Sequence, residues 1–522
     1  MQSTLDQFWR TGQDHEKTGD RDGARRAYES LVALNTHHVP ALLRLSRFAQ
    51  EAGGYRQAHQ YALRAADAAR LGGSTRHLAY VTLRLLDFAE EAELSSVVLG
   101  ADWADPEVLR QSPSLVQHLW LAGRYQDALR LLDAVEPRIA PHPLLRFGRG
   151  QVLQYLGDLA GAAHCYESAL ALSPHLPDLH WAIAKLRLDG SPARIARIHR
   201  ALGAVADEAG RAQLLYALFH ELDAAGDTRT AWPALAEAAA LMKRRLGDGC
   251  ALHAGARTLM DSDWRPPAAA TPGAPPQPRP IFVLGMPRSG TTLLDRMLGN
   301  HGWVTSVGER NDLFAAASQA SDTFYSGLCR QADPRAFLAS QDMAAIGQGY
   351  QQRLRGAAPA TAAAIDKHPR NLFELPLILA ALPQARIVCV RRDPMDVAFS
   401  NLKELFQGGA YAYSYEFGDL AAEVSLTREW MSHWAERAPH AVRVIDYRSL
   451  VDDAEATLAP LLSFLDLPAW PGLAHPERNT EPVATASSVQ VRAPVHRRGL
   501  DAWQRYAEPL APLQALLASV SP

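Results

Sequence analysis

The sequence of 522 residues predicts an α-helical solenoid followed by an α/β domain with a central parallel sheet. Two observations predict this fold class. In the first half, a glycine and an alanine five positions later recur with a period of 34 residues. In the second half, a β-branched apolar run leads through a glycine-containing turn into an amphipathic stretch, which is typical of a strand, a tight loop and a helix. A chain of this length usually needs more than one core.

The repeat in the first half has five recognisable units, whose glycines lie 34, 70, 34 and 69 residues apart. Each longer interval has room for one degenerate unit. A 34-residue period is typical of tetratricopeptide repeats, in which glycine starts the turn and alanine packs where two helices meet. We therefore expect six or seven helical hairpins over residues 5–260, in a solenoid domain of residues 1–264. The units are Gly19/Ala24, Gly53/Ala58, Gly123/Ala128, Gly157/Ala162 and Gly226/Ala231.

Between the two halves lies the segment RPPAAATPGAPPQPRP at residues 265–280. Its prolines predict a stiffened linker, so the second domain is expected over residues 281–522. The solenoid either binds an extended peptide or protein partner on its concave face, or serves as a scaffold or dimerisation surface. The sequence leaves both interpretations open.

Composition excludes some classes of function. A net charge of −3 argues against a dedicated nucleic-acid binder. The four cysteines lie far apart, without the spacing of a zinc site, which predicts reduced thiols and no metal. The polar N-terminus lacks a signal peptide, and no run approaches the ~20 apolar residues of a membrane-spanning helix. We therefore expect a cytoplasmic protein. The cysteines are Cys165, Cys250, Cys329 and Cys389.

The second domain begins with IFVLGMPRSGTTLLDRML at residues 281–298. Gly285 and Gly290 let the backbone turn its N–H groups inward, and the helix expected from Thr291 adds the positive end of its dipole. Nucleotide triphosphatases have a lysine where Thr291 stands. Arg288 supplies the cation from inside the loop, which suits a compact phosphate or sulfate better than a magnesium triphosphate. The alternative is a glycine turn with a purely structural role.

Further charged residues follow predicted strands. Glu309 follows a short strand at residues 304–307. Its carboxylate can lie at the ligand-binding edge of the sheet, or its negative charge can stabilise the N-terminus of the next helix. Lys367 follows an apolar run and either reaches a ligand or pairs with Asp366. Arg392 ends another strand and Ser400 lies eight residues later on a helix, so the two can converge on one dianion.

These strings together resemble the sulfotransferases that use 3′-phosphoadenylyl sulfate. The similarity spans residues 280–506 and is greatest to the tyrosylprotein sulfotransferases and their bacterial relatives. It rests on PRSGTTLL, VGERND, DKHP, the R-D-P-x5-S pattern and SSVQVRAPV. Two residues depart from the tyrosylprotein pattern: Glu404 stands where a basic residue is expected and Ala502 where a lysine is expected, and Arg497 or Arg498 can compensate.

The resemblance implies a role for each matching residue. Glu309 is the general base, with His368 as the alternative, and Arg288, Lys367 and Ser487 complete the catalytic set. The nucleotide is 3′-phosphoadenylyl sulfate as co-substrate and adenosine 3′,5′-bisphosphate as product, and no metal is required. The implied nucleotide-binding residues are Arg288, Ser289, Gly290, Thr291, Thr292, Leu293, Arg392, Ser400, Tyr447, Ser488, Val489, Gln490 and Arg492.

We therefore predict a P-loop-like α/β sulfotransferase domain that transfers the sulfuryl group to an acceptor hydroxyl. A tyrosine in a peptide or protein is the leading acceptor, and a hydroxyl of a small molecule, lipid or sugar is the alternative. A repeat adaptor with a vestigial transferase domain is a different class of answer. A magnesium-dependent kinase is disfavoured by the missing loop lysine.

Overall fold

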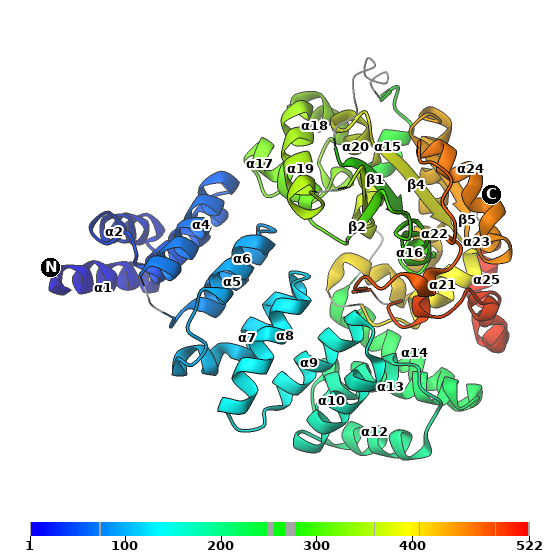
Figure 1. Cartoon of the computed structure of the whole chain (residues 1–522), viewed down its shortest axis with the longest axis horizontal. Helices are drawn as coiled ribbons and strands as arrows, with labels where there is room; N and C mark the ends of the chain where they lie inside the picture. Colours follow the sequence, from blue (N-terminus) through cyan, green and yellow to red (C-terminus); the bar gives the residue numbers. More distant parts are fainter. Residues whose placement is uncertain are drawn as a thin grey trace. The chain divides into compact units, whose positions relative to one another are not determined.

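The computed structural model describes residues 2–72, 75–247, 254–266, 277–359, 361–406, 408–485 and 487–519 (Figure 1). It contains two compact units. The first comprises Met1–Leu153 and Phe314–Tyr325, and the second comprises Gln154–Leu313 and Ser326–Pro522. The middle of the predicted linker (residues 267–276) and Cys250 lie outside the described residues. The domain boundaries drawn from the sequence stay a prediction.

The repeat region consists of helices that follow one another in pairs, as the 34-residue period predicts. The first unit holds α1 (Gln2–Thr18), α2 (Arg21–Leu34), α3 (Val39–Glu51), α4 (Tyr55–Leu71), α5 (Leu78–Leu86), α6 (Glu91–Leu99), α7 (Pro106–Leu121), α8 (Tyr125–Val135) and most of α9 (Pro143–Leu156). The second unit continues with α10 (Leu159–Leu172), α11 (Pro177–Lys185), α12 (Pro192–Ala204), α13 (Glu208–Ala224), α14 (Thr228–Leu246) and α15 (Gly255–Met260).

The turns between paired helices explain both the regular and the degenerate units. All five repeat glycines have a positive φ, between 69° and 101°, and all five repeat alanines are fully buried. The two degenerate units use Ala89 (φ 54°) and Arg187 (φ 55°) at the corresponding turns. These two turns therefore adopt the left-handed conformation without glycine. The conformation costs free energy in residues with a Cβ, because the Cβ comes close to the following carbonyl oxygen. Because these turns lack glycine, the glycine pattern missed two units.

The segment Phe314–Tyr325 belongs to the first unit although it follows the strand that leads to Glu309. Phe324 packs against Tyr55 with ring centroids 5.1 Å apart. Arg56 donates from its side chain to the carbonyls of Gln319 (2.8 Å) and Ala320 (2.6 Å). These carbonyls lie near the C-terminus of α17 (Asp312–Ser321), where the helix itself leaves acceptors unpaired.

The second unit contains one five-stranded sheet with the order β2-β3-β1-β4-β5, and every pairing is parallel. This confirms the predicted central parallel sheet. Residues 281–284 are completely buried, as expected for a strand covered on both faces. The strands are β1 (Arg279–Leu284), β2 (Val304–Gly308), β3 (Ala363–Asp366), β4 (Arg386–Arg391) and β5 (Val442–Asp446).

Helices cover the sheet and connect its strands. One hydrophobic core joins residues of the sheet to α16, α23 and α24. A second core joins α11, α13 and α14 of the repeats to α21, α22 and α25. The helices are α16 (Thr291–Leu298), α18 (Pro334–Ser340), α19 (Met343–Ala357), α20 (Leu375–Ala381), α21 (Pro394–Leu402), α22 (Phe417–Arg437), α23 (Tyr447–Asp452), α24 (Ala454–Phe464) and α25 (Ala507–Ser519).

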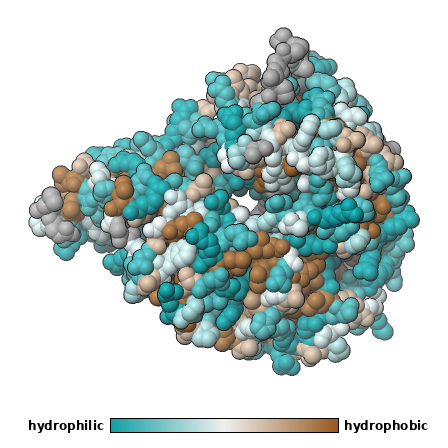
Figure 2. Space-filling model, in the orientation of Figure 1, coloured by the Kyte–Doolittle hydropathy of each residue, from teal (hydrophilic) through white to brown (hydrophobic). Residues whose placement is uncertain are grey.

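On the face drawn in Figure 2, hydrophobic residues lie between hydrophilic ones over most elements. Among the helices of the described ranges, none is both long and apolar enough to cross a membrane. Cys165, Cys329 and Cys389 are buried.

Candidate functional site

The carboxyl ends of all five strands lie at one edge of the sheet, because the strands are parallel. Each strand is followed directly by a residue or loop that the sequence singles out. Along the edge, in the order of the strands β2, β3, β1, β4 and β5, these are Glu309, Lys367, the loop of residues 285–290, Arg392 and Tyr447. The central loop therefore has the acid and the lysine on one side, and the second arginine and the tyrosine on the other.

The loop of residues 285–290 has the geometry of an anion cradle. Arg288 has a φ of 69° and Gly290 a φ of 112°, and no side chain caps the N-terminus of α16 that follows. A Cβ added to Gly290 would lie 2.2 Å from the Tyr447 ring, so only glycine fits there. The Ser289 Oγ is buried without a hydrogen-bond partner among the described residues. Free helix N–H groups and an unused hydroxyl suit an oxyanion.

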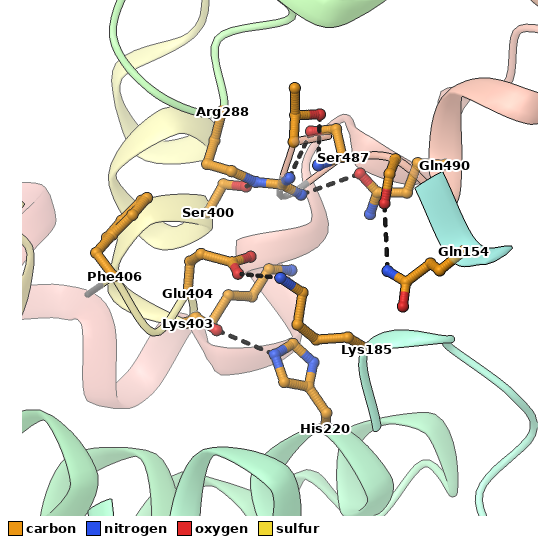
Figure 3. Close-up of polar contacts among 12 residues, drawn as sticks. Gln154, Lys185, His220, Arg288, Ser400, Lys403, Glu404, Phe406, Ser487 and Gln490 are labelled. Carbon is orange, nitrogen blue, oxygen red and sulfur yellow. Dashed lines mark hydrogen bonds and ion pairs between the residues drawn. The ribbon is translucent and has the colours of Figure 1, made fainter. Parts of the chain in front are cut away.

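The guanidinium of Arg288 gathers three predicted site residues from distant segments (Figure 3). Its Nε donates to Ser400 Oγ (3.3 Å), and its two terminal nitrogens donate to Ser487 Oγ (2.5 Å) and to Gln490 Oε1 (3.0 Å). Burial lowers the pKa of Arg288 from its ordinary value. Arg288 thus connects the cradle loop to helix α21 and to the segment at residues 487–492.

Arg392, which follows the neighbouring strand β4, also contacts the loop of residues 285–290. It donates to the carbonyl oxygens of Arg288 (2.8 Å) and Gly499, and its guanidinium carbon lies 4.7 Å from the centre of the Tyr447 ring. Its Nε has no hydrogen-bond partner in the described part of the chain. The spacing in the sequence predicts that Arg392 and Ser400 converge on one dianion, and this stays a prediction. In the structure the hydroxyl of Ser400 accepts a hydrogen bond from Arg288.

Glu309 and Lys367 form an ion pair across the ends of β2 and β3. The Lys367 Nζ lies 2.8 Å from Glu309 Oε1, and the lysine side chain is 4% exposed whereas that of the glutamate is 34% exposed. Asp366, the alternative partner of Lys367, instead accepts hydrogen bonds from Tyr350 (3.1 Å) and Asn371 (3.1 Å). A carboxylate open to solvent beside a buried ammonium can meet an incoming hydroxyl.

His368 is less suited to accept a proton. Its Nδ1 accepts a hydrogen bond from the backbone N–H of Arg370 at 3.1 Å, which leaves the proton of the neutral ring on Nε2. Burial lowers the pKa of His368 to about 4, so the ring is neutral near pH 7. In this tautomer Nε2 is a donor. The geometry favours Glu309 over His368 as a base.

The other predicted nucleotide-binding residues lie in the cradle or in the segment at residues 487–492. The Thr292 hydroxyl lies 3.3 Å from that of Thr485, while Leu293 packs its side chain into the core and donates its N–H to Gly290. Val489 directly precedes a 3₁₀ turn at Gln490–Arg492. Thr291 is the first residue of α16.

Repeat helices contribute contacts that sequence reasoning did not anticipate. His220 donates from Nε2 to the carbonyl of Lys403 (3.0 Å), and Tyr216 donates to that of Leu402 (3.1 Å), so α13 caps the C-terminus of α21. Glu404, which departs from the tyrosylprotein pattern, pairs with Lys185 at 3.6 Å (Figure 3). The repeat pattern marks core positions only, and it carries no signal for these contacts.

Lys403 gives the site a pH dependence that can be measured. Burial lowers its pKa from 10.5 to about 7; the positive charges of Arg187, Arg288 and Arg392 act in the same direction, and Asp223 acts against them. The folded chain therefore loses stability by holding this proton below pH 7, and the loss fades as pH rises toward 10.5.

We expect Lys403→Met to raise the melting temperature more at about pH 6 than at about pH 10, because the cost of burying the lysine is complete below pH 7 and has nearly vanished as the pH approaches 10.5, the pKa in the unfolded chain. Differential scanning fluorimetry at the two pH values measures the effect. Lys17→Met, at an exposed position of α1, is the control and should show no such trend. An equal gain at both pH values would contradict the assignment.

Among the described residues, no group of His, Cys, Asp and Glu side chains could hold a metal ion. The predicted site residues at the strand ends are mainly cations and hydroxyls, with the carboxylate of Glu309 beside them. Cationic side chains and hydroxyls donate hydrogen bonds to anions, so these residues suit a phosphate or sulfate group.

Comparisons with known proteins found a curated relative of part of the chain. An uncharacterized protein of Aquifex aeolicus (strain VF5) is 31% identical over 252 residues, which cover 46% of this chain and 32% of that protein. The chain thus spans about a third of the length of the curated relative it matches.

Two similar solved structures are sulfotransferase domains. That of the curacin biosynthetic pathway shares 18% identity and a TM-score of 0.32, covering 47% of this chain and 97% of that domain. The sulfotransferase domain of the Synechococcus PCC 7002 olefin synthase is 20% identical in sequence, with a TM-score of 0.34. The match covers 50% of this chain and 97% of that domain. Residues 280–472 match the sulfotransferase family. The C-terminal half of the chain therefore carries a sulfotransferase-family domain.

Proposed function

We propose that this chain transfers the sulfuryl group of 3′-phosphoadenylyl sulfate to an acceptor hydroxyl and releases adenosine 3′,5′-bisphosphate. The observation that carries the proposal is the line of residues at the carboxyl ends of the five strands, from Glu309 and Lys367 through the cradle loop to Arg392 and Tyr447. In this line, the cradle loop and Arg392 are proposed as two anion-binding sites, and Glu309 as the base. The repeat solenoid and the sulfotransferase domain are proposed to act together in one enzyme.

A polar atom of the cradle supports 3′-phosphoadenylyl sulfate as the sulfuryl donor: Ser289 Oγ is buried without a hydrogen-bond partner among the described residues. Arg392 Nε makes no hydrogen bond there either, but it lies 4.0 Å from Asp396 Oδ2 in a buried ion pair. The cradle and the N-terminus of α16 suit the phosphosulfate end. Arg392 and Tyr447 also line a cleft of about 800 Å³, whose walls hold Arg391, Arg428 and Arg448 together with Asp393, Asp446, Asp452 and Asp453. Acidic and basic side chains balance in this cleft, so binding of the phosphorylated ribose is proposed to rest on the guanidinium of Arg392.

In the proposed reaction, Glu309 accepts the proton of the acceptor hydroxyl while the acceptor oxygen bonds to sulfur. The bond from sulfur to the bridging oxygen breaks, and its electrons stay on the departing phosphate. Lys367 and Arg288 stabilise the charge that builds on that phosphate and on the sulfuryl oxygens, and Ser487 hydrogen-bonds there. Positioning and electrostatics supply most of the rate enhancement.

A tyrosine of a peptide or protein is the proposed acceptor. Tyr155 and Tyr411 both lie close enough to Glu309 for its charge to add to the effect of burial, which raises the pKa of each phenol. Transfer of labelled sulfate into tyrosine residues of a cell-extract protein would support this acceptor; label found only in small hydroxyl compounds would contradict it.

Adenosine 3′,5′-bisphosphate is expected to raise the melting temperature of the purified chain, because a ligand at 100 times its Kd adds about 2.7 kcal/mol. Adenosine 5′-monophosphate, which lacks the 3′-phosphate, should give a much smaller shift. Arg392→Lys keeps the charge but removes the planar fork, and should erase most of the difference between the two nucleotides.

Stabilisation by ATP and magnesium in place of the bisphosphate would instead indicate a kinase. A chain that responds to no nucleotide would fit a repeat adaptor with a vestigial transferase domain. Either result would contradict the proposal.

A further inference from the structure

One carbonyl of the repeat region holds both ends of the segment at residues 483–492, the closing segment. The Tyr155 carbonyl accepts a hydrogen bond from the backbone N–H of Val483 (2.9 Å) and another from the guanidinium of Arg492 (2.5 Å). Tyr155 lies in the last turn of α9. The two donors are nine positions apart, so a single acceptor closes the segment into a loop.

The middle of the closing segment is held by the residue next to Tyr155. Gln154 is 3% exposed and Ser488 is 1% exposed. The Gln154 Nε2 donates to Ser488 Oγ at 3.3 Å, and Figure 3 shows the amide of Gln154 turned toward the segment that carries Ser487 and Gln490. The Gln154 Oε1 accepts from the hydroxyl of Tyr166 (2.9 Å) on α10. A buried amide with partners on both sides has one orientation. The helix hairpin α9/α10 therefore fixes where Ser488 lies.

The turn of this hairpin is fitted to the closing segment. A Cβ added to Gly157 would lie 2.4 Å from Nη1 and 2.7 Å from Cζ of Arg492. The repeat glycines Gly19, Gly53 and Gly226 have the same positive φ, but an added Cβ would meet nothing within 4 Å. Glycine at position 157 thus allows the left-handed turn and also leaves room for the side chain of Arg492.

The closing segment carries residues that touch the cradle arginine. Ser487 and Gln490 both accept hydrogen bonds from Arg288, and Ser487 directly precedes the residue that Gln154 holds. A segment that is already ordered does not have to lose conformational freedom when the nucleotide binds. The residues that hold the closing segment, Gln154 and Tyr155, should therefore affect the affinity for the nucleotide.

We infer that Gln154 and Tyr155 of the repeat region are positioning residues of the nucleotide site, because they hold the closing segment in the place where it meets Arg288. The inference rests on the proposed function for its kinetic consequence. Its structural consequence can be measured without any ligand.

The first experiment is hydrogen exchange of the free protein, followed by mass spectrometry. Gln154→Leu removes the amide at nearly constant size and should speed exchange in the closing segment about ten-fold, while exchange in β1 stays unchanged. Gln151→Leu, one turn earlier on α9 and half-buried, is the matched control. Unchanged exchange of the closing segment in Gln154→Leu would overturn the inference whatever the enzyme does.

The second experiment measures the affinity for adenosine 3′,5′-bisphosphate and the KM and kcat for the sulfated donor. Gln154→Leu should weaken affinity and raise KM about five- to ten-fold with a smaller change in kcat. Ser488→Ala should act similarly, and the double variant should be no worse than either single one, because both remove one contact. Fully multiplicative effects would contradict the shared contact.

A glycine pair separates positioning from general stability. Gly157→Ala and Gly226→Ala both place a side chain at a positive φ, and both should lower the melting temperature. Only Gly157→Ala should also weaken bisphosphate binding, because only there does the new methyl group displace Arg492. Equal binding by the two variants would refute the inference, whereas absence of binding by the unmodified chain would refute the proposed function.

Discussion

Glu309→Gln is expected to lower turnover about 10²- to 10⁴-fold, which is the usual contribution of a general base. The substitution keeps size and hydrogen bonding but removes the group that accepts the proton. Because Glu309 lies at the end of β2 and away from the cradle loop, affinity for adenosine 3′,5′-bisphosphate should change little. Single-turnover transfer from the labelled donor measures the rate, and calorimetry measures the affinity.

Two further variants make this expectation decisive. His368→Asn keeps an acceptor for the Arg370 N–H and should retain most of the turnover. Glu455→Gln changes an exposed glutamate on α24 and should change nothing. A slow His368→Asn beside a fast Glu309→Gln would transfer the role of base to the histidine.

Lys367→Met is expected to lower kcat about 10²- to 10³-fold, the usual cost of removing one donor from developing negative charge. The Lys367 side chain is 4% exposed, so water cannot readily take its place. The Arg392 side of the site is untouched, and the thermal shift with the bisphosphate should therefore persist. Steady-state kinetics and the thermal shift are measured on the same preparation.

Lys367 has two possible roles, which the double variant separates. If the lysine only holds Glu309 in place, Lys367→Met combined with Glu309→Gln should be as slow as Glu309→Gln alone. If Lys367 stabilises the leaving phosphate directly, as proposed, the double variant should be slower still. Lys17→Met serves as the control for loss of an exposed lysine.

Much of the fold follows from local patterns in the sequence. The glycine of each repeat unit adopts the left-handed turn, and the alanine five residues later is buried. The apolar run at residues 281–284 forms the central strand. These features depend on a residue's own backbone freedom or on the side-chain period of one element, and both can be read within a few residues.

The sequence predicts which residues follow the strands, but not which residues they contact. Strand ends place Glu309, Lys367 and Arg392 at one edge, as the sequence indicates. Sequence spacing gave no sign of two contacts: Ser400 accepts a hydrogen bond from Arg288, and Lys367 pairs with Glu309 rather than with Asp366. Contacts of this kind depend on which strands are neighbours, and strand order is decided by packing of the whole sheet.

By itself, the sequence determined the helical repeats, the parallel sheet and the residues that follow its strands, because each depends on short-range periodicity or on one residue's conformational range. Only the tertiary structure decided that a repeat hairpin holds the closing segment. Gln154 and Ser488 lie 334 positions apart, and Ala89 and Arg187 make their turns without glycine. Such contacts are chosen by the shared core between distant elements, and no local pattern encodes that choice.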